Sequence, residues 1–143
     1  MDKNFTCKIA DFGVSRNMSH RMDLSVSCSH SKHFDLSYDL GTPLYSAPEI
    51  LNQETYDEKV DIYSLAIIYL ELLCSFKTQH ERLKVLSDIK NVRELPQLIQ
   101  DKYCHEYSLL TKMLKADPRE RYSVIDVLND TDYEKLKYSY MYG

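Results

Sequence analysis

Glycine is scarce in this sequence of 143 residues, which contains three glycines, Gly13, Gly41 and Gly143. A loop that cradles nucleotide phosphates needs two or three glycines within a few residues, because its backbone must approach the phosphates closely. The three glycines here are far apart in the sequence. The chain therefore carries no glycine-rich phosphate loop, and this restricts any function that depends on a nucleotide.

An excess of positive charge and a long apolar run are also lacking. The chain has 18 basic and 22 acidic side chains and a net charge of −4, which leaves no electrostatic footprint for a nucleic acid or an anionic membrane. The amino-terminal residues have no apolar core of signal-peptide length. The most apolar stretch, residues 62–73, contains Ser64 and Glu71. It is too short to span a bilayer, so we predict a buried helix there.

The cysteine pattern argues against a disulfide framework and against a metal site. Cys28-x-His30-x-x-His33 offers three candidate ligands, but the spacing matches no established zinc pattern. The cysteines have no secretory context, so we expect reduced thiols and a cytoplasmic protein. The scattered cysteines are Cys7, Cys28, Cys74 and Cys104.

The residues that are present fit one globular domain, with 43% apolar and 28% charged side chains. Residues 5–9 alternate apolar and polar side chains, which predicts a short strand. Residues 14–40 are rich in serine and have no sustained period, which predicts a long loop. Residue spacing then becomes helical, with predicted helices at residues 60–73, 81–92 and 107–114.

The carboxyl-terminal part predicts one further helix. Asp117-Pro118 is expected to end the preceding helix, because the residue before a proline avoids the helical region. Ser123, with Asp126 three residues later, resembles a capping box. Residues 132–142 are rich in tyrosine and are expected to be partly helical at best. The predicted buried side of the new helix consists of Val124, Ile125, Val127 and Leu128.

Two tripeptides, in a fixed order, carry the clearest functional signal. Asp11-Phe12-Gly13 follows the predicted strand, and Ala47-Pro48-Glu49 precedes the apolar helix. Asp61 stands at the start of that helix, and Arg121 lies three residues after Pro118. In this order and spacing, the chain resembles the carboxyl-terminal lobe of a eukaryotic serine/threonine protein kinase.

The resemblance implies a mainly α fold and an incomplete kinase domain. The domain would occupy residues 1–136, beginning at the last strand before Asp11, without the amino-terminal lobe or the catalytic loop. Its activation segment would span residues 11–49 and its helical lobe residues 56–136, and residues 137–143 would form a tail.

Further residues resemble one group of these kinases, those that phosphorylate the α subunit of translation initiation factor 2. The similarity lies in residues 41–45, 70–73 and 76–88 and continues at Tyr103-x-x-Glu106-Tyr107. Within that group the sequence is most similar to the endoplasmic-reticulum stress-sensing and haem-regulated branches. The α subunit would then be the family substrate.

The resemblance implies a role for each residue of the first tripeptide. Asp11 would hold Mg²⁺ against the phosphates of ATP, because Mg²⁺ prefers hard anionic oxygen ligands. Phe12 would pack inward and set the position of Asp11, and Gly13 would give the backbone freedom to move between active and inactive forms. Taken alone, an Asp-aromatic-Gly turn after a strand is common.

The resemblance also implies structural roles, each with a plainer alternative. Glu49 and Arg121 would form a buried ion pair that fixes the activation segment, or they are ordinary surface charges. Asp61 would accept hydrogen bonds from the catalytic loop. Because that loop is absent from this chain, Asp61 could instead cap its own helix.

Two residues of the activation segment and one helix are further candidates. Thr42 would line the substrate site. Ser37 matches a phosphorylated position of the group, and its alternative is a solvated loop serine. Residues 81–92 would dock the substrate, with a plain amphipathic helix as the alternative. The docking candidates are Glu81, Arg82, Leu86 and Asp88.

The functional expectation follows from what a complete kinase carries upstream. The strand lysine with its glutamate partner and the His-Arg-Asp loop with its asparagine are absent from this sequence. Since phosphoryl transfer needs these groups together, we expect this chain alone to be inactive and to bind neither ATP nor Mg²⁺.

Three alternatives remain open. The chain could be a pseudokinase-type binding module that docks a kinase partner through exposed apolar surface or a substrate through the helix at residues 81–92. It could be part of a longer gene product, whose full-length form could lie on the cytosolic side of a membrane. It could also be an unrelated helical domain.

Overall fold

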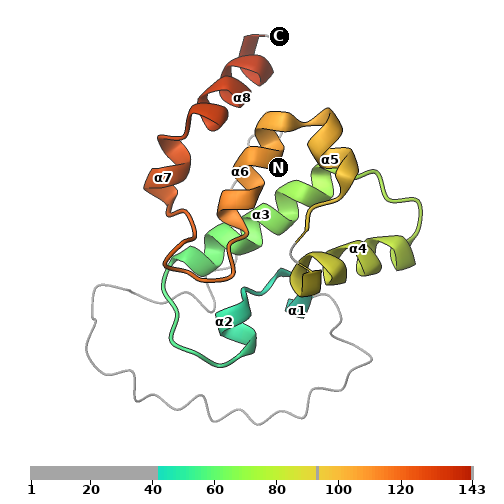
Figure 1. The fold of residues 1–143 in the computed structure, drawn as a ribbon, viewed down its shortest axis with the longest axis vertical. Coiled ribbons are helices and arrows are strands. Elements are labelled where there is room, and N and C mark those ends of the chain that lie inside the picture. The colour runs from blue at the N-terminus through green and yellow to red at the C-terminus, as the bar shows by residue number, and fades with distance from the viewer. Residues whose placement is uncertain (1–41, 93, 143) are drawn as a thin grey trace, which may run out of the picture.

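The computed structural model describes residues 42–92 and 94–142, and the regular structure within these ranges is entirely helical (Figure 1). The predicted strand at residues 5–9, the loop at residues 14–40, Asp11-Phe12-Gly13, Ser37 and the Cys28/His30/His33 group lie outside the described residues. The helices are α1 (Thr42–Tyr45), α2 (Pro48–Leu51), α3 (Lys59–Leu73), α4 (Gln79–Val92), α5 (Gln97–Lys102), α6 (Cys104–Met113), α7 (Val124–Leu128) and α8 (Thr131–Tyr142).

Helix α3 is the central element, as the sequence predicts. It crosses the middle of the helical bundle in Figure 1, and α1 and α6 both pack against it. Its apolar residues occur nearly all round the helix, so several neighbours can bury them at once. The core that it forms with α4, α5 and α6 includes Ala66, Ile67, Leu70, Leu86, Ile99 and Leu110, which are fully buried.

Helix α8 corrects the expectation that residues 132–142 are partly helical at best. The helix extends to Tyr142 and packs along α6, with Leu136 buried in the core. Asp130 caps the start of α8, because its carboxylate accepts hydrogen bonds from the backbone N–H groups of Asp132 and Tyr133 at 2.8 and 3.4 Å. Tertiary packing and this cap supply what the local sequence preference lacks.

Helix α7 begins as predicted, but its expected buried side is wrong. The Ser123–Asp126 capping box is present. However, Val124, Ile125 and Leu128 are 50%, 64% and 49% exposed, and Val127 alone of the four packs against the core. The helix has five residues. A helix of little more than one turn can present only a narrow stripe to its neighbours.

Two further boundaries differ from the sequence prediction. Helix α6 ends at Met113, four residues before Asp117, and the chain continues without regular structure towards Ser123. Helix α5 was not predicted and begins directly after Pro96. None of the helices in the described ranges is long and apolar enough to cross a membrane.

Candidate functional site

The candidate site is built around a buried ion pair between α2 and the segment after α6. Arg121 Nη1 donates to Glu49 Oε1 at 2.6 Å, and Nη2 donates to Oε2 at 2.9 Å, which is the two-pronged geometry of arginine with a carboxylate. Both side chains are buried. The two charges therefore lie together in the interior, and the alternative of two surface charges is wrong.

The remaining hydrogens of Arg121 bind backbone carbonyl groups. Nε donates to the Lys115 carbonyl, Nη1 to the Lys59 carbonyl and Nη2 to the Ala116 carbonyl, at 2.8, 3.1 and 3.0 Å. The guanidinium carbon also lies 5.0 Å from the centre of the Tyr63 ring. All five N–H donors are thus used, and one side chain joins α2, the start of α3 and the segment after α6.

The pKa of Glu49 reflects two opposing effects. Burial raises this pKa. The hydrogen bonds from Arg121 and from the backbone, together with the positive charge of Arg121, lower it by a larger amount. The net pKa lies below the ordinary value. Glu49 is therefore an ionised partner in the pair, with a structural and not a proton-transferring role.

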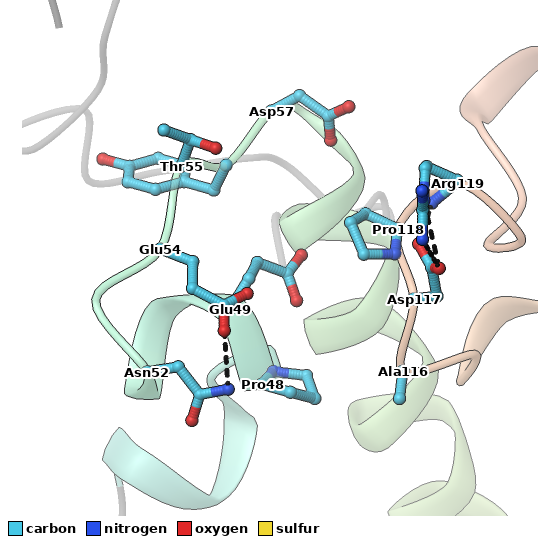
Figure 2. A pocket seen from close by; sticks show the side chains of 11 residues that line it. Pro48, Glu49, Asn52, Glu54, Thr55, Asp57, Ala116, Asp117, Pro118 and Arg119 are labelled. Atoms are coloured by element: carbon cyan, nitrogen blue, oxygen red, sulfur yellow. Dashed lines mark hydrogen bonds and ion pairs between the residues drawn. The ribbon is translucent and has the colours of Figure 1, made fainter.

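An open cavity of about 690 Å³ lies beside Glu49 of this pair (Figure 2). Its carboxylates already have partners: Glu54 accepts the Asn52 amide at 3.1 Å, and Asp117 binds Arg119 at 2.6 Å. Asp57 accepts the backbone N–H of Lys59 at 2.9 Å. Within residues 42–92 and 94–142, no three His, Cys, Asp or Glu side chains are grouped to hold a metal ion. The carboxylates Glu54, Asp57 and Asp117 of this cavity are therefore engaged in local hydrogen bonds.

The second part of the site is the short segment around α1, which α3 and α4 hold in place. Tyr45 Oη donates to Glu71 Oε2 at 2.6 Å, and Arg82 donates to both Glu71 and Tyr45. Ser64 Oγ donates to the Tyr45 carbonyl at 2.8 Å. The ammonium group of Lys90 donates to the carbonyl groups of Pro43 and Ser46. Because Thr42 is the first residue of α1, these contacts fix the chain just after it.

Burial and charged neighbours both shift the pKa values in this cluster. The pKa of Tyr45 is raised, first by burial and then by the Glu71 carboxylate, which accepts a hydrogen bond from its hydroxyl group. The pKa of Arg82 is also raised, chiefly by its hydrogen bond to Glu71. Burial lowers the pKa of Lys90 to about 8. The cluster is therefore a set of charged groups held in a partly buried environment.

The structure separates the four docking candidates of α4 into two kinds. Glu81 and Asp88 are exposed and can meet a partner. Leu86 is fully buried, so it belongs to the core and cannot meet one through its side chain. Arg82 is half-buried and engaged with Glu71 and Tyr45. Two of the four residues thus hold α4 in place, which leaves Glu81 and Asp88 as the proposed docking residues.

Asp61 lies in the first turn of α3 with its side chain exposed. The N-cap residue of α3 is Glu58, and no side-chain hydrogen bond closes that cap. Asp61 is therefore not a capping residue. Its negative charge near the amino terminus is still favourable, because the helix dipole is positive there.

Nothing in the sequence indicates the role of Lys90. A lysine in the last turn of an amphipathic helix ordinarily faces solvent and favours the helix terminus, so nothing in the pattern marks it as a contact to α1. The separation of 47 residues between Lys90 and Pro43 explains why only the folded chain reveals their contact.

Comparisons with known proteins indicate the family of this chain. A family model described as the protein kinase domain matches residues 1–132. Eukaryotic translation initiation factor 2-alpha kinase 3 of Bos taurus is 33% identical over 135 residues, which cover 92% of this chain and 12% of that protein.

Two further relatives carry similar names. The eIF-2-alpha kinase GCN2 of Schizosaccharomyces pombe is 32% identical over 135 residues, covering 90% of this chain and 9% of that protein. Eukaryotic translation initiation factor 2-alpha kinase PK4 of Plasmodium berghei is 43% identical over 91 residues, covering 63% of this chain and 3% of that protein. The chain thus spans a small part of the length of each relative.

Proposed function

Because this chain belongs to the protein kinase family, we propose that it is the helical, substrate-holding part of a kinase that phosphorylates the α subunit of translation initiation factor 2. The names of the similar proteins support this substrate. In the family reaction, the γ-phosphoryl group of ATP passes to a serine or threonine hydroxyl group, and ADP is released.

The binding surface in this proposal is the exposed side of α4. Glu81 and Asp88 lie seven residues apart and therefore share one face of the helix. On the other side of α4, Arg82 and Lys90 hold the helix to α3 and to the segment after Thr42. A substrate bound to α4 would thus lie beside the segment that, by resemblance, lines the phosphorylation site. This juxtaposition is the structural observation that best supports the proposal.

A binding titration tests this surface. The purified chain is titrated with the purified α subunit of initiation factor 2 by calorimetry, as wild type and as Asp88→Lys. Charge reversal at the centre of an interface should weaken binding at least about tenfold, since opposed charges set both encounter and fit. Glu134→Lys makes the same change on α8, far from α4 in Figure 1, and serves as the matched control. Equal loss in both variants, or no binding by the wild type, would overturn the proposed docking surface.

The proposal also holds that this chain alone does not transfer phosphate. Asp11, the proposed Mg²⁺ ligand, lies outside the described residues, and we assign no group of residues 42–92 and 94–142 to an ATP site. The chain is incubated with ATP, Mg²⁺ and the α subunit, and incorporated phosphate is measured. The expected incorporation equals that of a blank without the chain, and reproducible transfer would contradict this part of the proposal.

A second candidate function is a pseudokinase-type binding module that docks a kinase partner or substrate. The exposed apolar residues Leu65, Ile68 and Leu72 of α3 favour it, because monomeric proteins rarely expose such neighbours together. The measurement that separates the two is the activity of a separate, complete kinase on the α subunit with this chain added. A change in its rate that survives Asp88→Lys would favour the module, since α4 would then not be the surface involved.

A further inference from the structure

Lys90 makes contacts that its position on α4 does not predict. Its ammonium group lies between two backbone carbonyl groups, those of Pro43 and Ser46, with a distance of 2.9 Å to the latter. These carbonyl groups belong to α1 and to the residue that follows it. The side chain is partly buried.

Helix α1 needs such a partner. It has four residues, and a helix this short is not stable by itself because the cost of starting it exceeds the gain from its few hydrogen bonds. The last carbonyl groups of a helix have no partner within the helix, and a positive charge at that end is favourable. Lys90 supplies both a donor and a positive charge at this end of α1.

The burial of the ammonium group shows that this contact has a cost. Burial lowers the pKa of Lys90 to about 8, and no charged neighbour contributes to the shift among the described residues. A buried charge is tolerated where hydrogen bonds satisfy it. Here the two carbonyl groups do so, in place of the carboxylate that usually accompanies a buried lysine.

Three other side chains bind Tyr45 within this segment. Ser64 holds its carbonyl group, and Glu71 and Arg82 hold its hydroxyl group. Lys90 binds on both sides of Tyr45, and it does so from α4. Lys90 therefore ties the backbone on either side of Tyr45 directly to α4.

We propose that Lys90 is a positioning residue that fixes residues 43–46 against α4 and so couples binding at α4 to this segment. The coupling rests on the proposed function, because it assumes that α4 binds the substrate. The positioning of residues 43–46 does not, since it is a property of the free chain.

Amide hydrogen exchange on the full chain tests the positioning. In Lys90→Met, the amides of residues 44–47 should exchange at least about tenfold faster than in the wild type, while those of α3 keep their rates. Lys90→Arg keeps the positive charge and the donors and should restore exchange to within about threefold. Lys84→Met removes an exposed lysine of the same helix and should change nothing.

Three results would overturn the positioning role. The first is unchanged exchange at residues 44–47 in Lys90→Met. The second is an equal acceleration across α3 and α6, which would show general destabilisation. The third is failure of Lys90→Arg to restore the slow exchange, because the argument depends on a charged donor.

The same measurement with the α subunit present tests the coupling. In the wild type, saturation with the subunit should slow exchange at residues 44–47 further, and Lys90→Met should lose that slowing. Slowing that persists in the variant would contradict the coupling. If the wild type does not bind the subunit, the proposed function fails, and the exchange rates of the free variants still decide the role of Lys90.

Discussion

At the scale of a single residue, Arg121 fixes the arrangement of several segments. Its guanidinium group binds Glu49 and three backbone carbonyl groups and lies over the ring of Tyr63. A buried pair of this kind does not by itself imply high stability, because removing both ions from water is costly. Breaking the pair is nevertheless strongly destabilising, since the remaining charge is left without compensation.

Arg121→Met should lower the free energy of unfolding by about 3–5 kcal/mol, as expected when one partner of a buried pair is removed. Urea denaturation followed by circular dichroism measures the change. Arg119→Met is the control, because the Arg119 side chain is 88% exposed and surface substitutions ordinarily cost within about 0.5 kcal/mol. If Arg121→Met leaves too little folded chain, the double variant with Glu49→Leu provides the second test. It should be more stable than Arg121→Met alone, and a further loss would contradict the pairing.

Glu49 gives the pH dependence of the same pair. Its pKa is lowered on folding from an ordinary value of 4.5, despite burial, by its hydrogen bonds to Arg121 and the backbone and by the positive charge of Arg121. The unfolded chain therefore takes up this proton first as the pH falls. The stability that the pair contributes is fully present above pH 4.5 and is lost as the pH drops through the folded pKa.

Urea denaturation at pH values from 7 to 3 tests this sign. Other carboxylates, including Asp130, also have a lowered pKa, so the wild type should lose stability in acid and Glu49→Gln should lose less over the same range. Glu134→Gln, at an exposed position of α8, should follow the wild type. A curve for Glu49→Gln as steep as that of the wild type would show that Glu49 does not take part.

At the scale of the element, α7 and α8 contrast in how they meet the core. Helix α8 has twelve residues and buries Leu136 against its neighbours. Helix α7 has five and leaves Leu128 49% exposed. The longer helix is therefore an integral part of the fold.

Leu136→Ala should destabilise the chain by about 2–5 kcal/mol, because truncation of a buried leucine removes apolar contacts and leaves a cavity. Leu128→Ala makes the same change at a half-exposed position and should cost less than about half as much. Chemical denaturation compares the two variants directly. Equal losses would mean that α8 is not held against the core as the structure shows.

The helices with a long, regular pattern could be predicted from sequence, whereas the short ones could not unless a cap marks them, as it does for α7. Helix α3 is apolar nearly all round, α4 and α6 have clear stripes, and Ser123 with Asp126 marks the start of α7. Helices α1, α2 and α5 have six residues or fewer, too few to show a helical period. Tertiary contacts hold them instead, which is why local pattern analysis misses them.

The candidate site was predictable only where a motif marks it. The pair of Glu49 and Arg121 follows from two positions that the kinase resemblance singles out. The contact of Lys90 with residues 43–46 has no such signal, because backbone carbonyl groups leave no trace in the sequence. The burial of Leu86 likewise depends on which way α4 faces, and the amphipathic pattern alone did not settle that.

At the scale of the whole molecule, one side of the bundle is apolar and open. A cavity of about 380 Å³ lies between α3, α6 and α8. Leu72 is 79% exposed there, and other exposed apolar side chains of α3 and α8 line the same cavity. The residues concerned are Leu65, Ile68, Leu72, Tyr140 and Met141.

An exposed apolar face of this kind should make the isolated chain associate as its concentration rises. Leu72→Lys should shift that association to higher concentration and change the free energy of unfolding by no more than about 0.5 kcal/mol, as at other exposed positions. Analytical ultracentrifugation measures the association. Leu98→Lys places the same charge at an exposed position of α5, outside the cavity. The two variants should differ, and identical behaviour would show that the α3 face is not responsible.

The central claim is that α4, held to the segment after Thr42, is the surface on which this kinase-family chain meets its substrate. The most direct test is a nuclear magnetic resonance titration of the isotopically labelled chain with the α subunit of initiation factor 2. The account predicts that the backbone amide signals of α4 and of residues 43–47 change first and most strongly. Changes confined to α3 and α8, or no change at a saturating concentration of the subunit, would contradict it.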